Sequence, residues 1–436
     1  MESKLLMASV RKQIRFCWIH GMVLALFVLS VPAPLPAYSV LTHEQVVDFL
    51  WHSQIVKLLR ERYPNITPQQ LREAHAYAYG GSLIQDMGYY PGGNKFFSDL
   101  VHYVRSGDFV MEMVHQAQNP DELAFALGAL AHYISDTNGH PTVNRAVPME
   151  FPRLRKKFGD VITYSDDPPS HIQTEFGFDV LEVAKQRYTS QAYHDFIGFE
   201  VARPVLDRAF RATYGLELHE VLSDEDRAIG SYRHAVSVWL PRLTQTALIT
   251  KKDELEAIPN FNARKFRYTL KRAEYEKEWG KNYYHPGFFA KVLAVIIKVL
   301  PKVGALRVID PKPPTPETEK MYIASVEQTV AAYRKSLVIT EEKQLVLVDD
   351  DLDTGNLTTP GEYKLADRAY ARLLKELSQK NFAGAPPELR QNILSFYSDL
   401  NRPFETKRHE KDWKRVLVNL DELRHQPETA QDVQVR

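Results

Sequence analysis

The stretch AFALGALAHYISDTNGHP, residues 124–141, combines an apolar helical run with evenly spaced polar side chains. His132, Asp136 and His140 recur at intervals of four, which places them on one face of a helix, one turn apart. The apolar run before His132 indicates that this face is buried. A histidine beside an aspartate in an apolar interior is unfavourable unless a partner such as a cation compensates them. The stretch therefore predicts a buried metal site in a helical protein.

A second pair with the same spacing follows in the segment HIQTE, where His171 and Glu175 lie one helical turn apart. Imidazole nitrogen and carboxylate oxygen are zinc ligands, and zinc usually takes four donors per ion. Earlier segments, LTHEQ, GGSLIQDMGYYP and SDLVHYVRSGD, supply the further candidate ligands His43, Asp86 and His102. The complete set offers more donors than one ion needs, so it predicts a site with several zinc ions.

The N-terminus has the pattern of a secretory signal peptide over residues 1–37. A basic region from Lys4 to Arg15 precedes the apolar run WIHGMVLALFVLSV, and PAPLPA then leads to a small residue, Ala37. An uncleaved N-terminal anchor is the alternative, although the apolar run is short for a helix that spans a bilayer. The pattern predicts a secreted or periplasmic protein.

The single cysteine, Cys17, lies in this leader, so the mature chain would contain neither a disulfide nor a thiol nucleophile. The leader contains four basic residues and one acidic residue, so 51 basic and 54 acidic residues remain of the 55 of each kind. A charge so close to neutral does not favour a nucleic-acid partner, which usually requires a basic surface. Stabilisation is expected to come from the core and from metal.

The mature chain divides by composition into residues 38–250, 251–317 and 318–436. The first part has helical periodicity and few strand signals, so we expect a mainly α, multi-helix bundle that forms the catalytic domain. The second part is basic and aromatic and ends in the Pro-rich segment DPKPPTPE; its apolar stretch YYHPGFFAKVLAVIIKVLPKV would contact a membrane surface or pack on the protein. The third part is expected to be a smaller, mostly helical region with a disordered tail.

Local signals predict several helix boundaries. TPQQ at 67–70 and NPDE at 119–122 are N-terminal capping patterns with proline at the first helical position. Gly139 and Pro141 predict the end of the helix that contains His132, so His140 would lie just past its C-terminus. Ser170 is expected to cap the helix that follows it.

In the C-terminal region, QLVLV at 344–348 reads as a strand, and TPGE at 359–362 reads as the start of a helix. Between them, DDDLDTGN at 349–356 has the alternating aspartates of a calcium loop. Gly355 is one position late for the EF-hand turn, and Pro360 occupies the twelfth position, where a carboxylate is needed. A solvent-exposed turn is therefore predicted.

The ligand motifs resemble those of the zinc-dependent phospholipase C family, and more narrowly the catalytic domain of glycosylphosphatidylinositol-specific phospholipase D. The resemblance rests on Thr42-His43, on Gly81-Ser82-Leu83 followed by Asp86, on Val101-His102-Tyr103, and on the run from His132 to His140. It implies an all-helical hydrolase that holds three zinc ions and acts on a phospholipid or lipid headgroup.

The resemblance also implies how the ligands are shared. One zinc ion would be bound by Asp86, His102, His132 and Asp136, and a second by His140, His171 and Glu175. The third would be bound by His43, by Asp136 as a bridge, and by the backbone amine and carbonyl of the first mature residue. Cleavage after Ala37 would make that residue Tyr38, whereas bacterial members of the family typically have tryptophan there.

Clustered zinc ions would supply hydroxide at neutral pH and hold the phosphate oxygens, so no serine or cysteine nucleophile is needed. Asp86 could accept a proton from the attacking water or serve only as a ligand. Tyr89 and Tyr90 would line the cleft or pack in the core. Thr137, Asn138 and Asp99 are near enough in sequence to orient the imidazoles.

The expected function is that of a secreted zinc-dependent phosphodiesterase of the phospholipase C or D type, which cleaves phospholipid headgroup phosphodiesters in transient contact with a membrane surface. One alternative is a nuclease of the S1/P1 type, which uses a similar trinuclear cluster; the chain lacks the Trp-Gly N-terminus, the disulfides and the basic excess expected of such an enzyme. The other alternative is a non-catalytic envelope protein that zinc stabilises.

Overall fold

The computed structural model describes residues 40–90, 92–185, 199–236, 243, 244, 247, 311–341 and 344–426. The proposed signal peptide, Tyr38, most of the basic and aromatic segment and the last ten residues lie outside this part of the chain. Within it the protein is mainly α, as predicted. Every helix in the described residues is too short or too polar to cross a bilayer.

The N-terminal half contains α2 (Val40–Leu50), the π-helical turn η1 (Trp51–Ile55), α3 (Val56–Arg62), α4 (Pro68–Gly81), the 3-10 helix η2 (Ile84–Tyr89), α5 (Lys95–Tyr103), α6 (Ser106–Gln116), α7 (Pro120–Glu150), α8 (Pro152–Phe158) and α9 (Pro168–Ala184). The later elements are α11 (Arg203–Tyr214), α12 (Leu218–Val221), α13 (Glu225–His234), α18 (Pro316–Glu341), β1 (Asp350–Asp351), β2 (Asn356–Leu357), α19 (Lys364–Ser378), α20 (Pro387–Phe396), the 3-10 helix η5 (Glu405–Arg408) and α21 (Glu410–His425).

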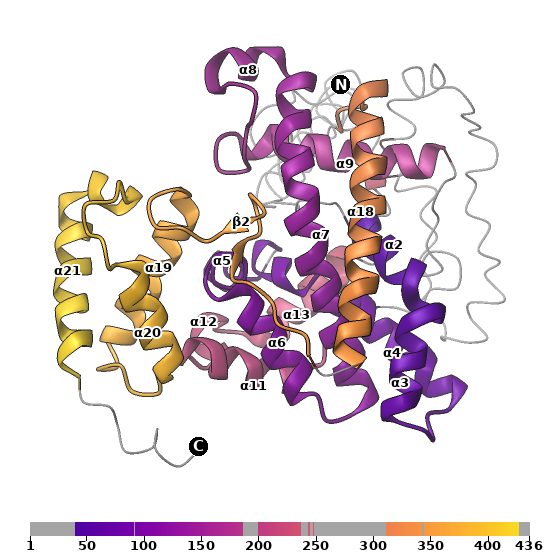
Figure 1. The fold of residues 1–436 in the computed structure, drawn as a ribbon, viewed down its shortest axis with the longest axis horizontal. Coiled ribbons are helices and arrows are strands. Elements are labelled where there is room, and N and C mark those ends of the chain that lie inside the picture. Colours follow the sequence, from indigo (N-terminus) through magenta and orange to yellow (C-terminus); the bar gives the residue numbers. More distant parts are fainter. Residues whose placement is uncertain are drawn as a thin grey trace, which may run out of the picture.

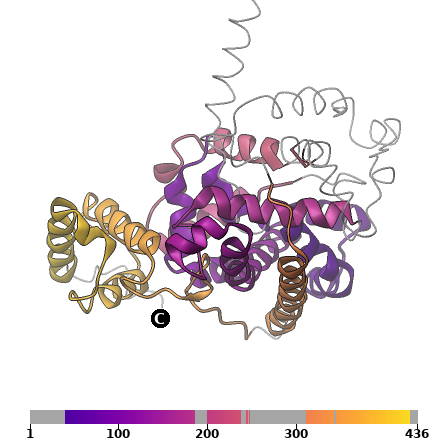
Figure 2. The ribbon, with the colours of Figure 1, turned by 90° about the horizontal axis from the view of Figure 1, so that it is seen from above.

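Helix α7 runs through the centre of the molecule, with α4 and α18 packed along it and α6, α9 and α2 in further contact with it (Figure 1). Helices α19, α20 and α21 lie together on one side in both views (Figures 1 and 2). They join the main body through α19, which packs on α5. One large apolar cluster includes buried residues from α2, from α7 and from α19. The division of the chain into separate domains stays a prediction.

Glycines allow α4 and α7 to approach closely. A Cβ atom on Gly128 would lie 2.1 Å from the carbonyl oxygen of Ala78, and one on Gly81 would lie 2.0 Å from that of Phe125. Real Cβ atoms do not come so near to backbone oxygen, so only glycine permits this spacing. The contact brings the C-terminal end of α4 against the middle of α7, where the candidate metal ligands begin.

Two of the predicted caps are confirmed. The Thr67 side chain accepts a hydrogen bond from the Gln70 amide in a capping box, and the Asn119 side chain accepts one from the Glu122 amide. The prediction for Ser170 is wrong, because the Asp167 carboxylate caps α9 and accepts from the Ser170 amide. An aspartate just before Pro168 has the right geometry and leaves Ser170 inside the first turn.

The predicted end of the central helix at Gly139 and Pro141 is also wrong, since α7 continues to Glu150. A proline inside a helix costs about 3 kcal/mol through the lost hydrogen bond and the ring contact. The turns beyond it fully bury Val143, Ala146 and Val147. Burial of an apolar side chain such as valine contributes about 1.5–3 kcal/mol, so packing outweighs the effect of the proline. His140 therefore lies on the helix, in line with Asp136 and His132.

Three predictions for the C-terminal region are corrected. Residues 344–348 are extended but form no strand. The helix predicted after TPGE is present as α19, but it begins at Lys364 with Tyr363 at its N-cap, after the TPGE turn. The segment 349–357 is a hairpin in which Asp351 pairs with Asn356, and it is not solvent-exposed as a whole. Asp351 and Asp353 are only 2% and 4% exposed. The hairpin packs on α5 and α7, and the sequence around it does not reveal that contact.

Candidate metal centre

Five helical elements bring the candidate ligands to one place. His43 is on α2, Asp86 on η2 and His102 at the end of α5, and the remaining ligands are on α7 (His132, Asp136, His140) and α9 (His171, Glu175). All eight are buried. The structure thus brings together at one site side chains from distant parts of the sequence, from His43 to Glu175.

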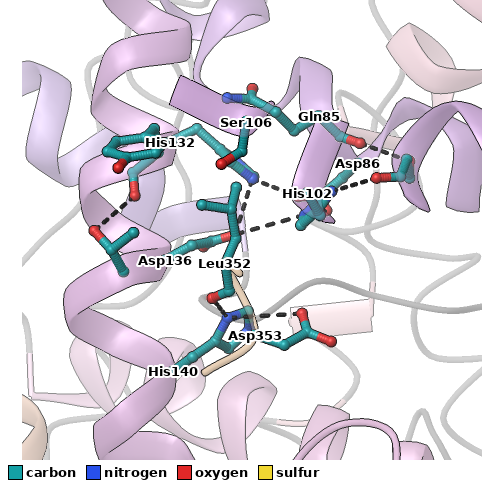
Figure 3. A network of polar contacts seen from close by, with 12 residues as sticks. Gln85, Asp86, His102, Ser106, His132, Asp136, His140, Leu352 and Asp353 are labelled. Atoms are coloured by element: carbon teal, nitrogen blue, oxygen red, sulfur yellow. Dashed lines mark hydrogen bonds and ion pairs between the residues drawn. The ribbon is translucent and has the colours of Figure 1, made fainter. Parts of the chain in front are cut away.

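These side chains form three groups in which the ligand atoms lie within 4.8 Å of one another. They are His43 with His132 and Asp136, Asp86 with His102 and His132, and His140 with His171 and Glu175. Asp136 belongs to the first group and also faces His102 of the second (Figure 3). Its carboxylate oxygens are 3.5 Å from His43 Nε2, 3.6 Å from His102 Nε2 and 3.0 Å from His132 Nε2. That position is the one expected of a carboxylate that bridges two ions.

Backbone carbonyls fix the orientation of two imidazoles. His102 Nδ1 donates to the Ser98 carbonyl at 2.8 Å, and His132 Nδ1 donates to the Ser82 carbonyl at 2.9 Å. Each ring therefore turns its Nε2 towards Asp86, at 3.4 Å and 3.8 Å respectively. A hydrogen bond of this kind to the outer nitrogen is what orients a metal-binding histidine and sets its tautomer.

The third group has the same design. His140 Nδ1 donates to the Leu352 carbonyl, and His171 Nε2 donates to Asn144 Oδ1 at 2.8 Å. The inner nitrogens, His140 Nε2 and His171 Nδ1, both face Glu175 Oε1. The outer partners of the four imidazoles were not predicted from the sequence, because three of them are backbone carbonyls. One of these, Leu352, is also more than two hundred residues from His140.

The residues that we expected to orient the imidazoles do not do so. Thr137 and Asn138 both donate to carbonyls of their own helix, at Tyr133 and Ile134. Asp99 forms an ion pair with Lys95, 3.4 Å away. Proximity in sequence placed them near the ligands, but helical geometry turns them to other faces. Tyr89 and Tyr90 are buried, at 7% and 5% exposure.

Burial is the main electrostatic effect on three of the candidate ligands, His43, His171 and Glu175. It lowers the pKa of His43 and His171 well below the ordinary histidine value, and neighbouring imidazoles lower both further. It raises the pKa of Glu175 well above the ordinary glutamate value, and the nearby aspartates add to this effect. Both imidazoles are therefore held in the neutral form, which is the form that binds metal.

At His102, His132 and Asp136, pairing outweighs burial. Burial opposes the charged forms of His102 and His132, but the carboxylates of Asp136 and Asp86 raise the pKa of both imidazoles above the ordinary value. The pKa of Asp136 is held well below its usual range by the same imidazoles, against the effect of burial. The carboxylates and imidazoles thus pair with one another at the positions where a divalent cation would bind.

The donor set fits zinc. Several ligand atoms are fully buried yet make no hydrogen bond: His132 Nε2, His171 Nδ1, and both carboxylate oxygens of Asp86, Asp136 and Glu175. Buried polar atoms are nearly always satisfied, and such a cluster of exceptions indicates an ion. Imidazole and carboxylate without thiolate is a zinc donor set. The first two groups share His132, so the three groups together offer eight side chains as donors.

The proposed N-terminal ligand Tyr38 lies outside the described residues. The chain just after it is held in place by the Asp179 carboxylate on α9, which accepts from the amides of Leu41 and Thr42 at 2.9 and 3.2 Å and from the Thr42 hydroxyl at 2.7 Å. The start of α2 is thus fixed beside α9, and His43 is fixed with it. The role of Tyr38 stays a prediction.

Comparison with known proteins gives one match. Residues 42–224 match the model of the family described as zinc dependent phospholipase C. No curated protein and no solved structure matches the chain. The matched segment contains every candidate ligand from His43 to Glu175 and ends before the hairpin 349–357. The part of the chain that forms the candidate metal centre is therefore similar to the zinc-dependent phospholipase C family.

Proposed function

We propose that the chain is a zinc-dependent phosphodiesterase that hydrolyses the headgroup phosphodiester of phospholipids. The observation that supports this most strongly is the convergence of buried ligand atoms in three groups, with the outer nitrogens of four imidazoles already engaged. The family match supports the choice of zinc and of a phospholipid substrate. The proposal of three zinc ions follows from the three groups and from the resemblance of the motifs.

Zinc bound in these groups would lower the pKa of a water molecule and neutralise the phosphate oxygens during an in-line displacement. Asp86 is the side chain that we propose to receive the proton of that water. Its carboxylate is fully buried and lies within 3.8 Å of both His102 Nε2 and His132 Nε2. A carboxylate held at this distance can act as a ligand and as a proton acceptor.

Two tyrosines pack against candidate ligands of the site. The Tyr89 ring packs against His102, with 5.8 Å between ring centroids, and the Tyr164 ring packs edge-on against His171 at 5.9 Å. Burial raises the pKa of both phenols, so both stay uncharged at neutral pH. A neutral cover of low polarity strengthens every charge interaction beneath it.

We also propose that the chain is exported, because its first 37 residues have the order of a signal peptide. Sequencing the N-terminus of the protein recovered from its natural compartment tests this. A mature chain that begins at Tyr38 is expected, and a chain that retains its leader would contradict the proposal.

Parallel assays with phosphatidylcholine vesicles and single-stranded DNA test the activity. The zinc-loaded protein is expected to hydrolyse the lipid, and the product identifies the bond: phosphocholine shows cleavage on the glycerol side, and choline shows cleavage on the headgroup side. The family match favours the first product, whereas the narrower resemblance to the phospholipase D domain favours the second. Rapid DNA cleavage with inert lipid, or full zinc loading without turnover of either substrate, would contradict the proposal.

A further inference from the structure

The hairpin 349–357 is joined to the metal centre by contacts that reach across most of the sequence. The Leu352 amide donates to the His102 carbonyl at 3.1 Å, and the Ser106 hydroxyl donates to the Asp350 carbonyl at 2.6 Å. The Tyr133 hydroxyl donates to the Val348 carbonyl at 2.6 Å. The hairpin is therefore fixed to α5, α6 and α7 along its length.

The tip of the hairpin fits against α7 because it contains glycine. Gly355 has a φ of +69°, in the left-handed region. A Cβ atom there would lie 2.3 Å from the Thr137 carbonyl oxygen and 2.9 Å from the Pro141 ring. A side chain at this position would lift the tip away from the helix, one turn from Asp136 and His140. The close fit holds the preceding residues in register with the ligands.

Leu352 and Asp353 contact the ligands directly (Figure 3). The Leu352 carbonyl accepts the Nδ1 hydrogen of His140, and Asp353 Oδ1 lies 3.8 Å from the same nitrogen. The Asp353 carbonyl accepts from Asn144 Nδ2 at 2.9 Å, while the oxygen of that amide accepts from His171. The two residues thus reach both imidazoles of the His140–His171–Glu175 group.

The Asp353 carboxylate is itself held by two phenols. Its Oδ2 atom accepts hydrogen bonds from the Tyr103 hydroxyl at 2.8 Å and from the Tyr363 hydroxyl. Asp353 is 4% exposed, and both tyrosines are buried. With Oδ2 engaged in this way, Oδ1 is the oxygen that remains directed towards His140. A buried carboxylate beside the outer nitrogen of a metal-binding imidazole raises the basicity of the ligand and fixes its ring.

We propose that Leu352 and Asp353 are an outer layer of the metal centre, and that Asp353 is a positioning residue for His140 and, through Asn144, for His171. The segment that contains them lies outside residues 42–224, which match the family model, so this layer is contributed by the chain's own C-terminal region. The inference rests on the proposed zinc site, but its test does not require that any lipid be hydrolysed.

Asp353→Asn in the full-length protein tests the proposal, with Asp350→Asn as the matched control. Asp350 is in the same hairpin and accepts from the Tyr133 hydroxyl at 3.1 Å, but it contacts no ligand. Zinc affinity is measured by competition with a chelator. Asp353→Asn is expected to weaken the binding of one zinc ion about 10- to 100-fold, and Asp350→Asn is expected to leave it unchanged.

Replacement of zinc by cobalt gives a second readout, because the visible spectrum of bound cobalt reports the geometry of its ligands. The spectrum should change in Asp353→Asn and not in Asp350→Asn. If Asp353→Asn does not fold, Tyr363→Phe, which removes one of the two phenol hydrogen bonds, is expected to weaken zinc binding in the same direction by a smaller factor. Unchanged affinity and spectrum in the folded variants would overturn the proposal, whereas intact zinc effects without lipid hydrolysis would contradict only the proposed function.

Discussion

Asp136 lies within 3.6 Å of three imidazole nitrogens, and no other carboxylate of the described ligand groups approaches so many. We predict that Asp136→Asn lowers both zinc content and hydrolysis, because an amide cannot bridge two cations as a carboxylate does. The loss of activity should exceed the roughly 100-fold effect that is typical when an outer partner of a ligand is removed. Mass spectrometry of bound zinc and the rate of lipid hydrolysis check this.

The control is Glu150→Gln, which alters another buried carboxylate, at the C-terminal end of the same helix. Glu150 accepts a hydrogen bond from Thr174 but belongs to none of the candidate ligand groups. This variant should keep the zinc content and activity of the unmodified protein. A full complement of zinc in Asp136→Asn would contradict the bridging role.

Glu150 gives a prediction of its own for the dependence of stability on pH. Burial raises its pKa from 4.5 to about 7, against hydrogen bonds that the Thr318 and Thr174 hydroxyls donate to it. The folded state therefore holds this proton more tightly than the unfolded chain. Its contribution to stability is complete below pH about 4.5 and is lost as the pH rises through about 7.

Glu150→Gln removes this titration. Relative to that of the unmodified protein, its free energy of unfolding should rise by about 3 kcal/mol between pH 4.5 and pH 8. Urea unfolding at a series of pH values measures the difference. Parallel curves for the two proteins would show that Glu150 does not titrate in this range.

The candidate ligands on α7 and α9 could be proposed from the sequence because spacings of four on a helix are local. The groups that orient the candidate ligand side chains could not be predicted from the sequence. Ser82 and Ser98 act through backbone carbonyls, which any residue could supply, and Asp353 reaches His140 only through the fold. Local periodicity contains no information about a contact between residues so far apart in the chain.

At the scale of the elements, the close packing of α4 on α7 sets the position of His132. Gly128→Ala should be destabilising by about 1–3 kcal/mol or more, because its Cβ atom would lie 2.1 Å from a backbone oxygen that cannot move alone. Gly230→Ala is the control: this glycine is exposed in α13, with nothing within 4 Å of the added atom.

The free energy of unfolding of the control variant Gly230→Ala should rise by about 0.5–1 kcal/mol, because alanine has a higher helix propensity than glycine. Thermal or denaturant unfolding of the two variants gives both values. If Gly128→Ala is as stable as the unmodified protein, α4 and α7 do not approach as closely as the distance of 2.1 Å requires. The packing of these helices would then not explain how the Ser82 carbonyl reaches His132.

The helices themselves were largely predictable, including the caps at Thr67 and Asn119. Two of the wrong predictions share one cause. The passage of α7 through Pro141 and the burial of the hairpin 349–357 both depend on packing between distant segments, and packing overrides the local preference of proline to end a helix and of aspartate to face water. The prediction that Ser170 caps α9 is wrong for a different reason, because the nearby Asp167 is an equally good capping residue.

For the whole molecule, zinc is expected to act as a stabilising ligand. The buried carboxylates and imidazoles repel one another or need protons when no cation is present, as the raised pKa of Glu175 indicates. Removal of zinc by a chelator should lower the melting temperature, and each site should contribute about 2.7 kcal/mol at a free zinc concentration of 100 times Kd. Calorimetry at increasing zinc concentration checks this, and a melting temperature that does not depend on zinc would contradict it.

The central claim is that the buried ligand groups form a three-zinc centre. The amount of zinc bound per chain, measured on the purified mature protein after removal of loosely bound metal, tests it most directly. Three zinc ions per chain are expected in the unmodified protein. A folded protein that retains only one zinc ion per chain, or none, would contradict the claim.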